Sequence, residues 1–288
     1  MTREDDFSKS SVAIVGLGLM GGSLALALRG HCKQLIGVDQ DPRVLDLALR
    51  RGVVDFTHTD PGVILPRAEL VILAMPVSAI LELLKRLPEF HPGPAVVLDL
   101  GSTKTEIMHE MEKLPPEFDP VGGHPMCGKE TSGLENADPD IYQGAAFALT
   151  ALERTSPEAR VLIEGVVRAI GASPIWLDPE IHDTWVATTS HLPYLMAVAL
   201  VGATSMDAAL LLGPGYLGVT RLAGSSPEMM ADILLTNHSR VMDALKQHHA
   251  QLETFGQAVQ KGDRDQLIAQ LEIARQRRQN LLEERGKG

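Results

Sequence analysis

The sequence predicts an α/β protein in which a doubly wound, mostly parallel sheet is followed by an all-α C-terminal domain. Short apolar runs alternate with helical patterns up to residue 178, and this order of elements builds a parallel sheet. The first apolar run leads into a turn with the glycine spacing G-x-G-x-x-G. From about Pro179 onward, helical patterns continue without a further convincing strand. These observations place a domain boundary near residue 178.

The first element is a strand over residues 12–15, a short apolar run typical of a strand buried on both faces. Three glycines follow, and small apolar residues continue as a helix to residue 28. The first glycine permits a tight turn, the second lets a pyrophosphate approach the backbone, and the third lets the helix pack on the strand. The N–H groups at the start of the helix then face the phosphates of a dinucleotide. The predicted cofactor-binding residues of this turn are Gly16, Leu17, Gly18, Leu19, Met20 and Gly21.

The second strand, residues 34–38, ends in Asp39, at the place where the motif expects an acid. A carboxylate there accepts hydrogen bonds from the ribose hydroxyls and repels the 2′-phosphate of NADP. The sequence therefore predicts NAD as the cofactor, rather than NADP or a glycine turn without a ligand. Arg43, the neighbouring cation that could attract a 2′-phosphate, lies a helical turn further on, in a helix that begins with Asp41 as N-cap and Pro42.

The rest of the first domain repeats the order of strand and helix. Because the carboxyl ends of parallel strands line one crevice, Pro76, Ser102 and the loop-like segment 121–133 are expected to converge with Asp39. Pro76 is therefore a further predicted cofactor contact, and His124 is expected just past a strand end. The remaining expected strands are residues 69–74, 95–100, 145–150 and 174–177, and the expected helices are 41–51, 78–87, one ending near 113, and 156–171.

The second domain is predicted to begin with one very long or broken apolar helix over residues 180–212. Its segment 192–212 carries a single charge, Asp207, and is long enough to span a membrane. Because basic flanks are missing, we expect a helix buried in a protein core instead. Further helices are expected at 226–260 and 262–285. The sequence thus predicts a Rossmann-like, dinucleotide-binding domain at 1–178 and a helical domain for substrate binding and dimerisation at 179–288.

The composition is that of a soluble globular protein, with 44% hydrophobic residues and a formal net charge of −11. The negative charge argues against nucleic acid and an anionic membrane as partners. An anionic ligand would then need a local cluster of positive charge. Two cysteines, Cys32 and Cys127, make no disulfide framework, and the polar start MTREDDFSKS has no signal-peptide pattern. We therefore expect a cytoplasmic location.

Five motifs stand in order over almost the whole chain: GLGLMGGS, DLGSTK, GGHPMCGKE, TSHLPY and TRLAGSSPEMMADI. The set resembles the prephenate and arogenate (cyclohexadienyl) dehydrogenase family of tyrosine biosynthesis. The resemblance implies an NAD(P)-dependent oxidative decarboxylation, in which hydride leaves C4 of a cyclohexadienol ring, the 4-hydroxyl becomes a carbonyl and the ring carboxylate departs as CO2. It also implies a small dicarboxylate substrate, a homodimer through the helical domain and no metal.

Two residues are predicted to carry the chemistry. Hydride can leave a carbinol carbon only if a base accepts the hydroxyl proton, and His124, a neutral imidazole near pH 7, suits that task. The alternative for His124 is a loop histidine hydrogen-bonded for structure. Ser102 matches the family's serine that hydrogen-bonds the same hydroxyl and aligns the nicotinamide, and it can equally be a helix N-cap. Lys104, in the same turn, is expected to be a solvated residue.

The substrate contacts come from the resemblance. Arg221 matches the family's substrate-binding arginine, and its planar guanidinium can hold a carboxylate with two hydrogen bonds. His191 matches a family position near the substrate, with a structural role in the buried helix as the alternative. Glu130 aligns with a residue at the pocket entrance, where a charged pair can gate access. His182 is balanced between a site role and a structural one.

Two departures from the family pattern concern the part of the site that reads the substrate's side chain. Tyr194 stands where relatives often have histidine, and Gly218 where they often have aspartate. Without a local acid to pair with the ammonium of arogenate, prephenate is the expected substrate and arogenate the alternative. Acids remote in sequence that could take the place of that aspartate are Asp183, Asp207 and Asp232.

Two other functions fit parts of the sequence. β-Hydroxyacid dehydrogenases share the opening glycine motif but rely on a lysine in their helical domain, and no lysine occurs between Pro179 and Ser239. A nucleotide-sensing protein that turns nothing over would not need His124, Ser102 and Arg221 together. The sequence therefore favours the oxidoreductase.

Overall fold

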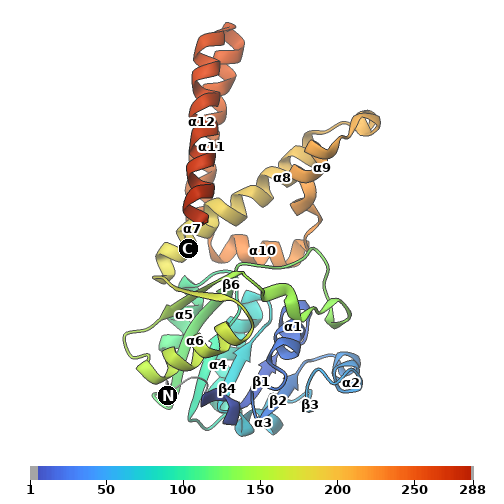
Figure 1. Cartoon of the computed structure of the whole chain (residues 1–288), viewed down its shortest axis with the longest axis vertical. Helices are drawn as coiled ribbons and strands as arrows, with labels where there is room; N and C mark the ends of the chain where they lie inside the picture. Colours follow the sequence, from blue (N-terminus) through green and yellow to red (C-terminus); the bar gives the residue numbers. More distant parts are fainter. Residues whose placement is uncertain (1–5, 287–288) are drawn as a thin grey trace. The chain divides into compact units, whose positions relative to one another are not determined.

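The structure, a computed structural model, describes residues 6–286, and the strands in this range form an eight-stranded sheet. The strand order is β3-β2-β1-β4-β5-β6-β7-β8, and all neighbours run parallel except the antiparallel pair β6 and β7. This confirms the predicted α/β class with a mostly parallel sheet (Figure 1). The strands are β1 (Ser11–Val15), β2 (Gln34–Val38), β3 (Phe56–His58), β4 (Leu70–Leu73), β5 (Ala95–Asp99), β6 (Phe118–Pro125), β7 (Ala146–Ala151) and β8 (Ser173–Trp176).

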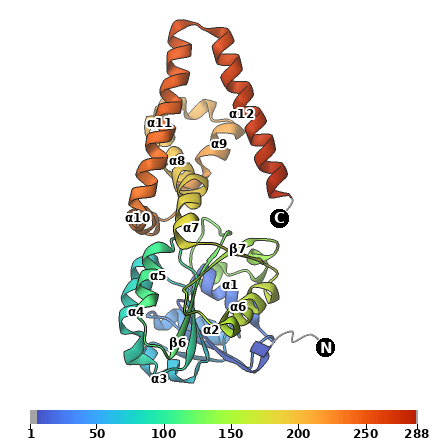
Figure 2. The same cartoon turned by 90° about the vertical axis from the view of Figure 1, so that its left-hand side faces the viewer.

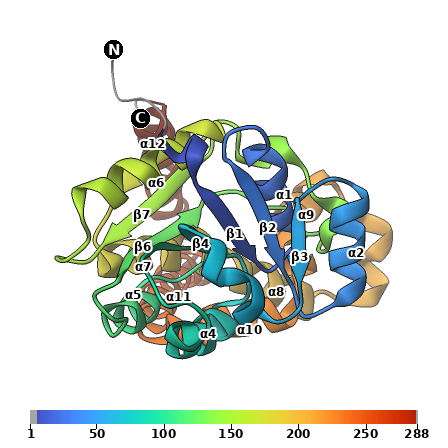
Figure 3. The same cartoon turned by 90° about the horizontal axis from the view of Figure 1, so that it is seen from below.

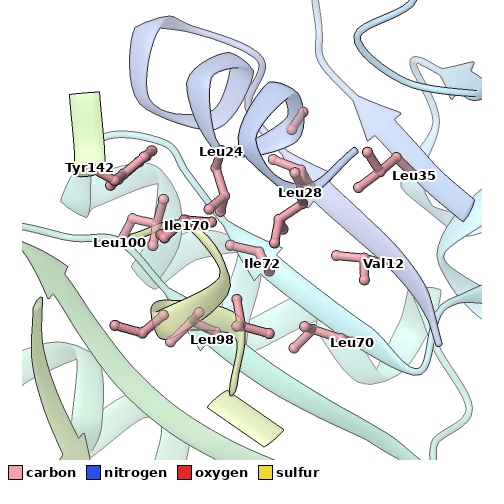
Figure 4. Packing of buried hydrophobic residues seen from close by; sticks show 14 of the residues in the cluster. Val12, Leu24, Leu28, Leu35, Leu70, Ile72, Leu98, Leu100, Tyr142 and Ile170 are labelled. Atoms are coloured by element: carbon pink, nitrogen blue, oxygen red, sulfur yellow. The ribbon is translucent and has the colours of Figure 1, made fainter. Parts of the chain in front are cut away.

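Helices cover both faces of the sheet, as expected for a doubly wound fold. Alternate residues of β1 point to opposite faces, so Val12 and Ile14 join one core and Ala13 and Val15 the other. Helices α1 and α6 pack on the first face, where Figure 4 shows Val12 near Leu28, and α4 and α5 pack on the second (Figure 3). The helices of this region are α1 (Leu19–Leu28), α2 (Pro42–Arg50), α3 (Pro61–Ile64), α4 (Val77–Phe90), α5 (Thr105–Glu112) and α6 (Pro157–Ala169).

The glycine turn between β1 and α1 is held from two sides. Gly16 has a φ of 92°, and its N–H donates to the carbonyl of Val38 at 2.8 Å. A Cβ at Gly21 would lie 1.9 Å from the carbonyl oxygen of Gly16. A Cβ at Gly18 would meet no atom within 4 Å, so this glycine borders open space. Gly16 therefore permits the turn, Gly18 leaves open space beside the backbone, and Gly21 permits close packing.

The end of β6 differs from the sequence prediction. His124 is not in a loop past a strand end, because it lies inside β6 and pairs with Ala148 of β7. The antiparallel partner β7 extends the ladder as far as Pro125, and such pairing between distant segments leaves no local sequence signal. The short strand β3 is also absent from the sequence prediction, and its pattern of half-exposed residues explains why.

The helices that follow the sheet begin at Pro179, and they divide more often than the sequence predicts. The expected helix 180–212 is interrupted by a π-helical turn at Ala187–His191, and the expected helix 226–260 divides at Asn237. The segments are α7 (Pro179–Val186), α8 (Leu192–Ala203), α9 (Pro214–Thr220), α10 (Pro227–Thr236), α11 (His238–Lys261) and α12 (Arg264–Arg285).

The expectation that segment 192–212 is a buried core helix is wrong for the single chain. Helix α8 ends at Ala203, and Ala197 is its one buried residue in the described chain. Val198 and Val201 are 41% and 45% exposed. By length and composition alone, the helical segment Pro179–Ala203 could cross a membrane, and 22% of its most apolar 18 residues are buried. This helix therefore presents an apolar surface that the chain does not cover itself.

The described chain forms two compact units that divide between His238 and Ser239. The boundary expected near residue 178 falls inside the first unit, because α7 packs against α5 and α10 against α4. The second unit contains α12 and all of α11 except its first residue, and Figure 2 shows the two helices joined by a turn. Gly262 lies in this turn and has a φ of 64°. Residues 1–5, half of the polar start on which the expected absence of a signal peptide rests, lie outside the described residues.

The substitution Gly21→Ala should destabilise the protein, because its Cβ would lie 1.9 Å from the Gly16 oxygen and 2.9 Å from the Ala74 Cβ. Overpacking of this kind costs about 1–3 kcal/mol, and a backbone atom cannot move aside easily. Gly18→Ala is the matched control: its φ of −73° suits alanine and its Cβ meets no atom. We expect a lower urea midpoint for Gly21→Ala alone. Equal midpoints for Gly21→Ala and the parent would contradict the packing argument.

Candidate active site

A cavity of about 590 Å³ lies at the carboxyl ends of β1, β4 and β5. Its wall is formed by the glycine turn, by Pro76 after β4, by Ser102 after β5 and by His124 in β6. The segment that includes Glu130 and the start of α10 line its other sides. The structure thus brings together Gly18, Leu19, Met20, Pro76, Ser102, His124 and Glu130.

The remaining residues of the predicted dinucleotide site support the turn from behind. The carboxylate of Asp39 accepts hydrogen bonds from the N–H groups of Leu17 at 2.9 Å and Asp41 at 3.0 Å. Each carboxylate oxygen retains a second lone pair for a ribose hydroxyl. The Leu17 side chain is buried in the core, and Gly16 and Gly21 pack on each other behind the cavity wall.

The cavity fits a pyrophosphate on two observations. Helix α1 has no side-chain hydrogen bond at its N-cap, Gly18, so the N–H groups of its first turn are free to meet an anion. The open space beside Gly18 is the cradle that a Cβ would fill. Arg43, the cation that could attract a 2′-phosphate, is bonded to Asp41, at 2.8 Å for the shortest contact.

His124 is held neutral by its surroundings. Burial is the main cause that lowers the pKa of its imidazole well below the usual value, and His182, Lys104 and His191 lower it further. Asp183 acts in the opposite direction. The Nδ1 atom of His124 lies 2.9 Å from Nε2 of His182. A neutral imidazole on a cavity wall is competent to accept a proton near pH 7.

A buried ion pair lies behind the catalytic wall and corrects the expectation that Lys104 is solvated. Lys104 and Asp99 are both fully buried, and the ammonium bonds to the carboxylate. The ammonium also donates to the carbonyl of Gly123 at 2.7 Å, and Asp99 accepts from the N–H groups of Gly101 at 2.7 Å and Gly123 at 3.1 Å. Burial raises the pKa of Asp99 and lowers that of Lys104, and their mutual attraction opposes both shifts. The pair therefore ties the residues before Ser102 and His124 to one another.

Ser102 lines the cavity but is not a helix N-cap, the alternative that its sequence position suggests. Helix α5 begins at Thr105, with Lys104 at the N-cap position and no side-chain cap of its own. The carboxylate of Asp183, from α7, instead accepts hydrogen bonds from the N–H groups of Lys104, at 2.7 Å, and Thr105, at 2.9 Å. A distant acid therefore caps α5, which leaves Ser102 to face the cavity.

The predicted substrate residues divide into two groups. Glu130 lines the cavity and forms an ion pair with Arg221, which begins the short helix after α9 and is 61% exposed. His191 is buried, and burial lowers its pKa to about 4. His191, which ends the π-helical turn before α8, and Tyr194, in the first turn of α8, are absent from the cavity lining. A Cβ at Gly218, in α9, would meet no atom within 4 Å.

Sequence reasoning missed several residues that hold the site in place. Asp99 closes β5 directly before the predicted turn, a position where an acid at a strand end is a usable signal. No such signal marks the hydrogen bond from the Lys104 N–H, at the start of α5, to the Asp183 carboxylate. None marks the hydrogen bond from Asn237 to the Asp183 carbonyl either, at 2.7 Å. Within residues 6–286, no group of three or more His, Cys, Asp or Glu side chains could hold a metal ion.

Two family models match consecutive parts of the chain. The model described as "Prephenate dehydrogenase, nucleotide-binding domain" matches residues 24–175. The model described as "Prephenate dehydrogenase, dimerization domain" matches residues 178–273. The two matches meet close to the boundary expected from the sequence.

Relatives and solved structures agree with these matches. Prephenate dehydrogenase of Bacillus subtilis (strain 168) is 30% identical over 95% of this chain and 76% of its own length. The crystal structure of prephenate dehydrogenase from Aquifex aeolicus, in complex with hydroxyphenyl propionate and NAD+, has a TM-score of 0.88 and 30% identity, covering 96% of this chain and 99% of that one. Arogenate dehydrogenase of Synechocystis has a TM-score of 0.81 and 28% identity, covering 94% and 99%.

Proposed function

The chain belongs to the prephenate dehydrogenase family, and we propose that it catalyses the NAD-dependent oxidative decarboxylation of prephenate to 4-hydroxyphenylpyruvate. The observation that carries the proposal is the position of a neutral His124 beside Ser102 on the wall of a cavity that starts at the glycine turn. That cavity unites a place for a dinucleotide with a base for a hydroxyl proton. The protein is thus an oxidoreductase of tyrosine biosynthesis.

The first domain supplies the cofactor site. When bound, NAD accepts the hydride from the substrate. The N–H groups at the start of α1 hold the pyrophosphate, and Pro76 lines the same cavity. The Asp39 carboxylate accepts hydrogen bonds from the ribose hydroxyls and repels a 2′-phosphate, which favours NAD over NADP.

His124 and Ser102 act on the 4-hydroxyl of the substrate. As the C4–H bond breaks and its electron pair leaves as hydride, the imidazole of His124 accepts the hydroxyl proton and a C4 carbonyl forms. Ser102 hydrogen-bonds the same oxygen. When the bond to the ring carboxylate breaks, its electron pair enters the ring, and the proton returns from His124 to the oxygen of the phenol. His124 therefore has to hold a proton between two steps.

Arg221 and Glu130 form the entrance for the substrate's carboxylates. In a chain of net charge −11, Arg221 is a local cation, and its partner Glu130 lies on the cavity wall. A substrate carboxylate replaces Glu130 as the partner of Arg221, so the ion pair acts as a gate. His191 and Tyr194 are proposed to serve the substrate's side chain from the start of α8, where Tyr194 can donate a hydrogen bond.

The choice of prephenate over arogenate depends on which acids are free to pair with an ammonium. Asp183 is occupied by hydrogen bonds from His182, Lys104 and Thr105. Asp232 accepts a hydrogen bond from Ser78 Oγ at 2.5 Å. Asp183, Asp207 and Asp232 are all absent from the cavity lining, and this supports prephenate as the substrate. Arogenate is the alternative, in keeping with the likeness to Synechocystis arogenate dehydrogenase.

The helical residues 179–288 are proposed to bind substrate and to form a homodimer in the cytoplasm, without nucleic acid or membrane as partner. The match to a dimerization-domain model supports the dimer. So does the apolar surface around α8, which a second copy would cover. The exposed apolar residues there are Val198, Leu200, Val201, Met206, Leu210, Leu211, Leu212, Leu217 and Val219.

The function is tested by incubating the purified chain with NAD and prephenate and following NADH absorbance. His124→Asn should lower kcat by roughly 10²–10⁴-fold, the usual contribution of a general base. The affinity for NAD should stay nearly unchanged, because the asparagine leaves the glycine turn intact. If the parent forms no NADH with prephenate and none with arogenate, the proposed function is refuted. A parental kcat for His124→Asn would remove that residue from the mechanism.

Arg221→Ala should raise KM for prephenate about 10- to 100-fold with a smaller change in kcat, since charge-assisted hydrogen bonds contribute about 1.5–3 kcal/mol in ground and transition state alike. Arg221→Lys is the matched control: it retains the charge but loses the planar fork. We expect an intermediate KM for it. Steady-state kinetics with an unchanged KM for Arg221→Ala would show that the carboxylate is held elsewhere.

Light scattering at micromolar concentration should give twice the chain mass of 31.1 kDa. The exposed apolar face of α8 offers the surface to be buried. Leu200→Glu and Val201→Glu together should reduce the mass toward that of one chain, because two buried, unpaired charges oppose association. Val161→Glu, on the exposed side of α6 and 65% exposed, is the control and should leave the mass unchanged. A parent of single-chain mass would contradict the dimer.

A further inference from the structure

A chain of hydrogen bonds leads from His124 away from the cavity. Nδ1 of His124 lies 2.9 Å from Nε2 of His182, and Nδ1 of His182 lies 2.8 Å from the Asp183 carboxylate. His182 and Asp183 are 1% and 0% exposed, so the chain runs through the protein interior. The two histidines are 58 residues apart in sequence, on β6 and α7. Neither partner is needed to explain how the cavity binds a dinucleotide.

Asp183 is the charged end of this chain. Burial by itself raises the pKa of the carboxyl, but hydrogen bonds from His182 and Thr105 outweigh burial and bring the pKa to about 2. The carboxylate also accepts the N–H of Lys104 at 2.7 Å, and Asn237 donates to the Asp183 carbonyl at 2.7 Å. An ionised carboxylate held from several sides can only accept hydrogen bonds.

With His182 neutral, that constraint determines the tautomer of both histidines. Because the Asp183 carboxylate only accepts, Nδ1 of His182 carries a proton and donates it. In a neutral His182, Nε2 then has the lone pair, so it accepts from Nδ1–H of His124. His124 is left with its lone pair on Nε2. This is the tautomer that accepts a proton at Nε2 while Nδ1 remains bonded to the protein.

We propose that His182 and Asp183 are positioning residues, which hold His124 in the tautomer with a free Nε2 and share the proton that it accepts. The proposal rests on the proposed function, since it assigns roles within the same site. When Nε2 of His124 is protonated, its Nδ1–H bond can break and an N–H bond can form on Nε2 of His182. The positive charge then lies between His124 and the Asp183 carboxylate, and the proton returns by the reverse step.

The charged and titratable groups around His124 shift its pKa in opposite directions. His182 on α7, Lys104 before α5 and His191 before α8 each lower the pKa of His124, and Asp183 raises it. Asp183 is therefore the group that opposes the repulsion from three basic neighbours. His124 works as a base only when neutral, so activity is lost as the pH falls through its pKa. Because His182 accepts from His124 Nδ1–H in this arrangement, removing it should shift the pH at which activity is lost.

The test compares two substitutions at His182. His182→Asn places an amide near Nδ1, where it can still donate to Asp183 but no longer reaches His124. His182→Gln places an amide oxygen near Nε2, where it can accept from His124 Nδ1–H but cannot take a proton. We expect His182→Asn to lower kcat roughly 10- to 100-fold, less than loss of the base itself. His182→Gln should recover part of that loss, and NAD affinity should be parental in both.

Asp178→Asn is the control on the same helix, because asparagine also serves as the N-cap that Asp178 provides to α7. It should leave kcat, the pH profile and the thermal unfolding temperature unchanged. Parental kcat and an unshifted pH profile in His182→Asn would overturn the proposal. So would equal losses in His182→Asn and His182→Gln that follow a lowered unfolding temperature, which would indicate a structural role alone.

Ring ¹⁵N chemical shifts of His124 test the same idea without turnover. In the parent bound to NAD, we expect the proton on Nδ1, and in His182→Asn a mixture of the two tautomers. A parent with the proton on Nε2 would overturn the proposal whatever its activity. A parent that turns over neither prephenate nor arogenate would refute the proposed function, and the shifts would still decide whether His182 and Asp183 position His124.

Discussion

Asp99 and Lys104 form an ion pair that is fully withdrawn from water, and the geometry of the cavity wall at Ser102 and His124 depends on it. Both charges are satisfied by backbone groups of Gly101 and Gly123, the residues that precede Ser102 and His124. Desolvation makes such a pair costly, and removing one partner typically costs about 3–5 kcal/mol. The pair therefore has little freedom, and it holds in place the backbone directly before Ser102 and His124.

Helix α7 adds a second constraint from the other side of the same turn. Its Asp183 caps α5 through the N–H groups of Lys104 and Thr105, and the same carboxylate accepts from His182. One acid thus completes a helix end of the first domain and anchors the hydrogen bonds that reach His124. These bonds join α7 to α5 and contribute to the packing of both helices in one compact unit.

Local positive groups offset the negative net charge of the protein at the cavity. A chain of net charge −11 has to receive an anionic cofactor and an anionic substrate. The uncapped start of α1 provides partial positive charge for the first, and in the proposed function Arg221 provides a full charge for the second. In the structure Arg221 is paired with Glu130.

Local sequence determined the features that depend on sterics and periodicity. The glycine turn, the acid at Asp39, the alternation of strand and helix and the family motifs could all be read along the chain, because each depends on neighbours in sequence. The tertiary structure alone decided the burial of Lys104, the place of His124 inside β6 and the exposure of α8. It also decided the roles of Asp183, whose bond to Lys104 spans 79 positions. Burial and hydrogen-bond partners are properties of surfaces that meet only when the chain has folded, so no local pattern contains them.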